Sequence, residues 1–177
     1  MTSKMIQRQN PQRGMLQRIP EYKMQVLDMV VQSDVLSKLI FFNTPDALFN
    51  DDMSDEEKQD LIYSRVFPYR FVPDPVEQQG TYLTIGASGF RKSQGGSGTS
   101  DKYQSGEIIF YFFTHHDLMR TDSGVRQDLI LGELEKIFDG YSGIGMGTLK
   151  LRSATELWIH NNKFGGYTVS FTLSDLG

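Results

Sequence analysis

The stretch EIIFYFF, residues 107–113, decides the fold class expected for this chain. It is a dense run of β-branched and aromatic residues, the composition of a strand that packs on a pleated, half-buried surface. A second strand is predicted before it at residues 81–85, where bulky and small residues alternate. Because a long glycine-rich segment separates the two, we interpret them as a hairpin with an extended polar loop.

Apolar residues at helical spacing predict helices on the N-terminal side of this hairpin. One helix is predicted to begin at Glu21, and a short second helix follows it with Ser33 or Asp34 as its cap. The apolar stripe of the first helix contains Met24, Leu27, Val30 and Val31.

The spacing of Ser54 and Glu57 is that of a capping box, which predicts a third helix that buries Leu61, Ile62 and Val66. The following segment, FPYRFVPDPVEQQG at residues 67–80, contains three prolines. Proline interrupts helices and central strands, so this segment is predicted to be an extended connector or an edge segment.

A last helix is predicted to begin at Thr121 or Asp122 and to end at Asp139, followed by strands at about 148–159 and 167–173. Its apolar stripe is Val125, Leu129, Leu134, Ile137 and Phe138, and the last strand is predicted to point Val169, Phe171 and Leu173 to one face. The order of elements predicts an α+β fold with a single, mostly antiparallel sheet and helices packed on it. Residues 1–20 are predicted to be a basic flexible arm, and residues 21–177 a single domain.

Residues 84–93, TIGASGFRKS, nearly match the phosphate-binding motif G-x-x-x-x-G-K-[ST], with Arg91 in the place of the second glycine. That motif also requires a helix to begin at the Lys-Ser pair. Here Gly95, Gly96 and Gly98 follow, and each disfavours a helix by about 1 kcal/mol. We therefore interpret the stretch as a strand that enters a loop, and we expect no nucleotide and no other cofactor.

The residue types that support catalysis or metal binding are sparse in this chain. It contains no cysteine, which excludes thiol catalysis and cysteine-ligated metals. His115 and His116 follow the strongest strand, and neighbouring residues on a strand point to opposite faces, so we interpret them as a strand end. We expect no enzyme, no catalytic residue and no metal site. A small nucleotide- or metal-dependent enzyme is the alternative from another class.

Charge is unevenly distributed along the chain. The net charge of −4 disfavours sequence-independent binding to nucleic acid, and no apolar run suits a signal peptide or a membrane helix, so we expect an intracellular protein. The arm is basic through residues that include Arg8, Arg13 and Arg18, whereas residues 46–60 are acidic and include Asp51, Asp52 and Glu56. These are either two unrelated solvated segments or the two sides of a head-to-tail contact between copies of the chain.

The succession of elements resembles the neck proteins of tailed bacteriophages, in particular the tail terminator or tail completion proteins. The resemblance rests on the N-terminal helical part, the connector RVFPYRFVPD (65–74), the two strands with their polar loop, the helix at 122–139 and the closing piece GIGMGTLKLRSATELWIHNNKFGGYTVSFTLSDL (143–176). It covers roughly residues 20–177.

The resemblance implies a structural virion protein of the neck, assembled in the host cytoplasm. Such proteins form rings, commonly hexamers, that cap the tail tube and join it to head-tail connector proteins, with DNA passing through the bore. Sequence-specific DNA binding and membrane binding are not expected. A head-completion or head-tail adaptor subunit is the alternative. We expect the contacts with other subunits or partners to involve Arg8, Arg13, Arg18, Asp51, Asp52, Glu56, Arg91, Lys92 and Lys102.

Overall fold

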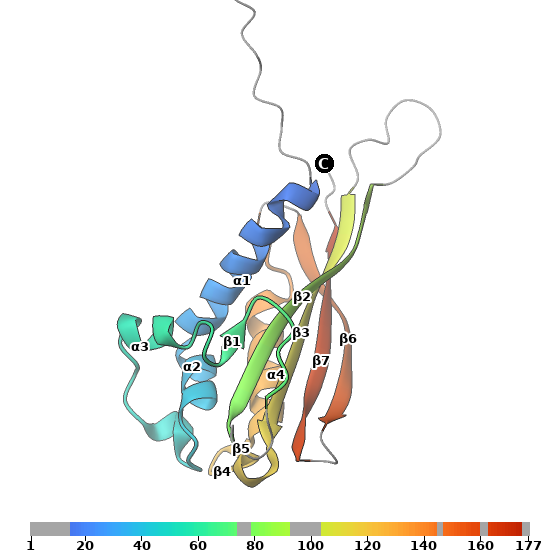
Figure 1. Cartoon of the computed structure of the whole chain (residues 1–177). Coiled ribbons are helices and arrows are strands. Elements are labelled where there is room, and N and C mark those ends of the chain that lie inside the picture. The colour runs from blue at the N-terminus through green and yellow to red at the C-terminus, as the bar shows by residue number, and fades with distance from the viewer. Residues whose placement is uncertain (1–14, 74–78, 93–103, 145–146, 160–162, 175–177) are drawn as a thin grey trace, which may run out of the picture.

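The computed structural model describes residues 15–73, 79–92, 104–144, 147–159 and 163–174, and it confirms the α+β class (Figure 1). Its main sheet has five strands in the order β1-β2-β3-β7-β6. These strands are β1 (Val66–Phe67), β2 (Thr81–Lys92), β3 (Gln104–His115), β6 (Thr148–Ile159) and β7 (Phe164–Ser174). β1 is parallel to β2, and all other neighbours are antiparallel.

The hairpin of β2 and β3 is confirmed and is longer than predicted. Pairing runs from Thr81 opposite Thr114 to Lys92 opposite Gln104, with one irregularity between Ser88 and Arg91. Gly89 lies in this irregularity at φ 63°, a conformation that favours glycine. Residues 84–92, the described part of the stretch that nearly matches the phosphate-binding motif, are therefore all strand.

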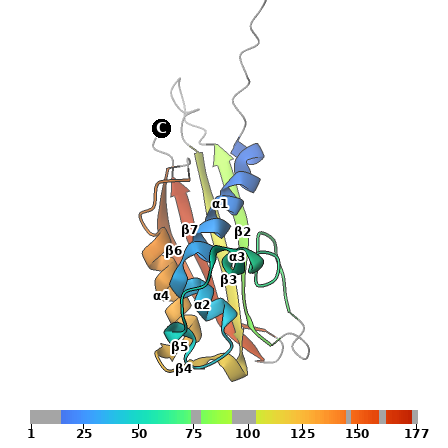
Figure 2. The same cartoon turned by 90° about the vertical axis from the view of Figure 1, so that its left-hand side faces the viewer.

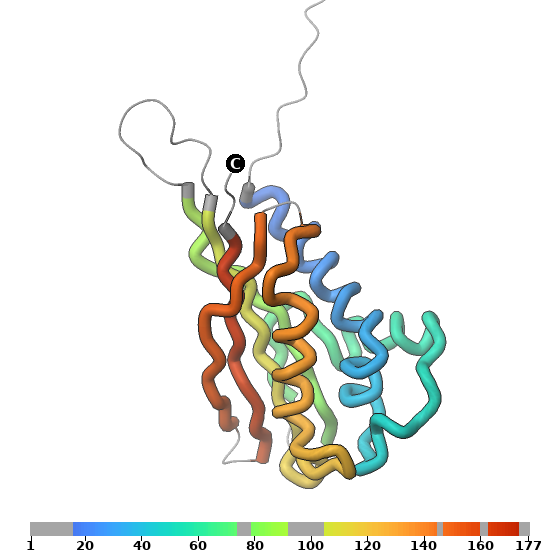
Figure 3. The backbone as a smooth tube through the Cα atoms, turned by 180° about the vertical axis from the view of Figure 1, so that it is seen from behind, coloured from blue at the N-terminus to red at the C-terminus, as the bar shows by residue number. Residues whose placement is uncertain are grey.

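The helices α1 (Ile19–Gln32), α2 (Asp34–Phe41) and α4 (Arg126–Phe138) cover one face of the sheet (Figures 2 and 3). α1 begins two residues before Glu21, and a short 3-10 helix, η1 (Met15–Arg18), precedes it inside the segment expected to be an arm. The predicted cap of α2 is confirmed, since the Ser33 hydroxyl accepts from the Leu36 N–H at 3.3 Å. Met24 was wrongly placed in the apolar stripe and is 42% exposed.

The start of α4 was predicted wrongly. Thr121 does not cap it, because its hydroxyl donates to the Gly124 carbonyl at 2.7 Å and closes a small hairpin of β4 (Arg120–Thr121) and β5 (Gly124–Val125). α4 begins only after this hairpin, and Val125 is exposed. The buried apolar side chains of α4 are Ile130, Leu134 and Phe138.

The acidic region contains η2 (Ala47–Phe49) and α3 (Asp55–Asp60). The Ser54–Glu57 capping box is confirmed. The helix was expected to continue through Val66 and does not, because the chain turns at Tyr63 with φ 64° and then enters β1. Leu61 and Val66 are nonetheless buried, as predicted.

The main core lies between the helix layer and the sheet. Alternate strand residues point into it, which confirms the predicted alternation in β7 and extends it to the neighbouring strands. The buried strand residues of this core are Leu83, Ile85, Ile108, Phe110, Phe112, Leu149, Val169, Phe171 and Leu173. A second, smaller cluster of Phe67, Tyr82, Phe113 and Phe164 lies apart from the main core. It covers only part of its side of the sheet.

Candidate interaction surface

The sheet face turned away from the helices is rich in hydroxyl groups. Strand register places Thr84, Tyr111, Thr168 and Thr155 side by side in one row across β2, β3, β7 and β6. The next row is Gly86, Ile109, Ser170 and Ser153. The Ser153 and Ser170 hydroxyls are 2.8 Å apart and share a hydrogen bond. We call this surface, made of these two rows and their neighbours, the open face.

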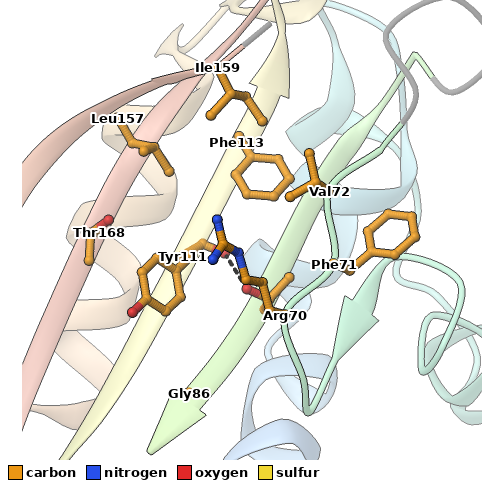
Figure 4. Close-up of a pocket in the computed structure, with 10 residues that line it drawn as sticks. Arg70, Phe71, Val72, Gly86, Tyr111, Phe113, Leu157, Ile159 and Thr168 are labelled. Atoms are coloured by element: carbon orange, nitrogen blue, oxygen red, sulfur yellow. Dashed lines mark hydrogen bonds between the residues drawn. The ribbon is translucent and has the colours of Figure 1, made fainter. Parts of the chain in front are cut away.

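A pocket of about 360 Å³ lies on the open face (Figure 4). Gly86, Tyr111 and Thr168 form its floor, with walls of Phe71 and Val72 from the connector after β1 and of Leu157 and Ile159 from β6. Thr84, which pairs with Tyr111, also lines the pocket. Phe113 and Arg70 complete the lining. The pocket is therefore mostly apolar, with a few polar groups among its lining residues, which is the composition of sites that bind ligands or side chains.

Two features keep the pocket open. Gly86 has no side chain, and a Cβ at this position would lie 3.3 Å from Cε2 of Tyr111, so the glycine leaves room for the tyrosine ring on the floor. Phe71 stacks on Phe67 with ring centroids 4.1 Å apart and an angle of 16° between the rings. Phe71 also packs against Tyr82 at 5.5 Å, which fixes the connector wall to the second apolar cluster.

Charges on and beside the open face are only partly paired. Arg152 forms an ion pair with Glu107. The guanidinium of Arg65 lies 4.9 Å from the ring centroid of Tyr82, and burial raises the pKa of the Tyr82 phenol although Arg65 opposes this shift. Arg70 is exposed and has no ion-pair partner within the described part of the chain, and its guanidinium points over the pocket toward Tyr111 (Figure 4).

The basic residues expected to make contacts are spread along the chain. Arg91 is exposed on β2, where its Nε donates to the Ser105 hydroxyl at 3.3 Å. Arg18 lies over the ring of Tyr22 at 5.0 Å. Lys92 ends β2, and its side chain lies outside the described residues, as do Arg8, Arg13 and Lys102.

The acidic residues expected to make contacts divide into two groups. Asp52 is paired inside the chain, with its carboxylate 2.6 Å from the Lys38 ammonium, which holds the pKa of this carboxyl below its usual value. Asp51 and Glu56 are exposed. α3, which carries Glu56, projects from the side of the helix layer, well away from the described ends of the β2–β3 hairpin (Figure 1). Those expected contact residues that the structure describes therefore do not form a single site within one copy of the chain.

The two adjacent histidines have separate environments. His115 is buried, packs edge-on against Phe164 at 5.2 Å, and accepts from the Asp117 N–H at 3.3 Å through Nδ1. His116 is exposed. Among the described residues, no three histidine, aspartate or glutamate side chains come together as metal ligands.

Sequence reasoning missed the pocket. The alternation of β3 could have placed Tyr111 and Phe113 on the face opposite Phe110 and Phe112. The connector brings Arg70, Phe71 and Val72 over that face. Its path depends on tertiary packing, and no local sequence pattern predicts it.

Comparison with known proteins identifies a family. A family model described as YomW matches residues 33–173, which include the whole of β1, β2, β3 and β6 and most of β7. No curated protein matches the chain. Within the described residues, every helix is too short or too polar to cross a membrane.

Proposed function

Because the chain belongs to the YomW family, a phage-type family of the kind found in Bacillus phage SPbeta, we propose that it is a structural protein of the virion neck. In this proposal, copies of the chain form a ring that terminates the tail tube and joins the tail to the head. DNA passes through the bore of the ring. In this role the protein joins other proteins and catalyses no reaction.

The observation that carries this proposal is the open face with its pocket. Helices cover one side of the sheet, whereas the other side presents an apolar pocket walled by Phe71, Leu157 and Ile159. An exposed apolar recess with a polar surround is typical of a surface that another protein covers. A ring subunit needs such surfaces, because each copy contacts two neighbours.

The β2–β3 hairpin supplies a second surface for assembly. Its described ends, at Lys92 and Gln104, lie at the same end of the molecule as the start of α1 (Figure 1). The exposed Arg91 lies close to this end. We assign this end to the contact with a neighbouring subunit or with the tail tube.

The charge of the chain suits a protein through which DNA moves. A net charge of −4 supplies little attraction for phosphates, so DNA in the bore would slide and would not be retained. A basic lining would instead hold the DNA and slow its passage.

A phage that lacks the gene tests the proposal. Electron microscopy of the lysate should show tails of irregular, often excessive length and DNA-filled heads without tails, and addition of the purified protein should restore joined particles. Tails of normal length that remain unattached would favour the head-completion or adaptor role. Infectious particles with normal tails in the absence of the protein would rule out both roles.

A further inference from the structure

The acidic region presents one large apolar side chain to solvent. Phe49, the last residue of η2, is 73% exposed, more than any other large apolar side chain among the described residues. Asp46 and Asp51 flank it and are exposed. Covering a side chain this exposed with another apolar surface would be favourable, because it removes apolar area from water.

The backbone at Phe49 is held in a fixed position. Its N–H donates to the Asp46 carbonyl at 2.8 Å, and the side-chain amide of Asn50 donates to the carbonyls of Asp46 and Ala47 at 3.1 and 3.3 Å. Ala47 is fully buried in the main core and anchors the turn. Little backbone entropy would therefore be lost when this turn meets another surface.

The pocket on the open face suits this segment in size and in charge. Its volume of about 360 Å³ lies at the small end of the range for side-chain and ligand sites. Phe71, Tyr111 and Phe113 offer ring partners for a phenylalanine. At the pocket, Arg70 lacks an ion-pair partner among the described residues, as does Asp51 two residues after Phe49.

We propose that Phe49 of one copy inserts into the pocket of the next copy, where Asp51 pairs with Arg70. This inference rests on the ring of the proposed function and identifies the two surfaces through which its subunits would meet. Ala47 anchors η2 in the core on the helix side of the sheet, whereas the pocket lies on the open face. The contact is therefore head-to-tail, and each copy has one of each surface, so it repeats until rotation closes the ring.

Truncation of Phe49 tests the contact directly. In sedimentation of the purified full-length protein, Phe49→Ala should weaken self-association by at least about tenfold, as expected for an aromatic residue at the centre of an interface. Met24→Ala is the control, because Met24 is 42% exposed within α1 and takes no part in the contact. Equal association of Phe49→Ala and the wild type would overturn the proposal.

Charge reversal tests the polar half of the contact. Asp51→Arg and Arg70→Asp should each weaken association, and the double variant should recover most of it, because the pair is restored with its signs exchanged. Both residues are exposed, so circular dichroism of the variants should match the wild type. If the double variant associates as weakly as either single variant, the side chains of Asp51 and Arg70 do not pair.

Mixing two deficient variants tests the head-to-tail geometry. Phe49→Ala retains an intact pocket, and Thr168→Trp fills the pocket while keeping Phe49. Each variant alone should associate at least about tenfold more weakly than the wild type. At a concentration where each variant alone is monomeric, an equimolar mixture should give dimers that do not grow further. A mixture that remains monomeric would overturn the head-to-tail contact.

Two outcomes separate this contact from the proposed function. If Phe49→Ala forms normal rings and the phage still requires the protein for tail joining, the neck function stands and the Phe49 contact is wrong. If the wild type never self-associates but binds tail tubes through Phe49, the surface that receives Phe49 belongs to the tube and the proposal of a second copy is overturned.

Discussion

The guanidinium of Arg126 is buried, and its Nη1 lies 2.6 Å from the carbonyl oxygen of Leu39 in the last turn of α2. The same side chain donates to the carbonyls of Phe42, Thr44 and Leu118 at 2.8 Å each. Burial lowers the pKa of Arg126, and the partial negative charge of the α2 C-terminus favours the cation. One residue of α4 thus fixes the end of α2 and the segment that leads to η2.

Replacement of Arg126 should strongly destabilise the protein. Arg126→Met removes four hydrogen bonds and leaves buried carbonyls without donors, so we expect a loss of about 3 kcal/mol or more in the free energy of unfolding by urea. Arg120→Met, at an exposed position on β4, is the control and should change stability by less than about 0.5 kcal/mol. Equal effects of the two substitutions would contradict the role assigned to Arg126.

Two glycines should respond to alanine in opposite directions. Gly132 lies inside α4 with nothing within 4 Å of an added Cβ, so Gly132→Ala should stabilise the protein by about 0.5–1 kcal/mol. A Cβ at Gly166 would lie 1.9 Å from the Phe112 carbonyl oxygen, so Gly166→Ala must displace β7 from β3 and should lower the melting temperature. Thermal unfolding measures both, and a neutral Gly166→Ala would show that this close approach is not required.

The acidic region should weaken as the pH falls. Hydrogen bonds from Ser54 lower the pKa of Glu57 from its ordinary value of 4.5, and Lys38 lowers that of Asp52 from 3.8. Because both folded pKa values lie below the unfolded ones, these groups contribute stability above about pH 4.5, which is lost as the pH falls through the folded values. The double variant Glu57→Gln, Asp52→Asn should show a shallower dependence of stability on pH between about 5 and 3. If the dependence of stability on pH is the same in the double variant as in the wild type, Glu57 and Asp52 are not responsible for the loss of stability at low pH.

The hairpin end should contribute to assembly without contributing to folding. Arg91→Glu reverses an exposed charge beside the end of β2, and we expect about tenfold weaker binding to purified tail tubes, or weaker association of subunits, with an unchanged melting temperature. Arg120→Glu is the control for a charge reversal elsewhere on the surface. A lower melting temperature in Arg91→Glu would instead place Arg91 among the residues that stabilise the sheet.

The sequence predicted the sheet well because its strands carry their own signal. Alternation in β7 and the dense aromatic run of β3 reflect burial of one side of a pleated strand, so Val169, Phe171 and the hairpin partner were placed correctly. The end of α3 was missed because it depends on one backbone angle at Tyr63. The start of α4 was missed because a threonine that resembles a cap bonds instead to Gly124.

The candidate interaction surface was less predictable than the fold. Charged segments suggested Asp51 and Arg91 as contact residues, and both are exposed. The pocket joins a connector residue, Arg70, to Thr168 of the last strand, nearly a hundred residues later in the chain. No local sequence pattern predicts that these two segments lie together, because their contact depends on how the segment after β1 crosses the sheet.

The bonds of Arg126 also set an order of events during synthesis. The carbonyls of Leu39, Phe42 and Thr44 accept hydrogen bonds from Arg126, which lies 87, 84 and 82 residues further along the chain. A nascent chain that has not yet reached α4 therefore lacks the group that fixes the turn before Phe49. The segment that leads to the side chain proposed to join one copy to the next thus gains these bonds only after α4 has been synthesised.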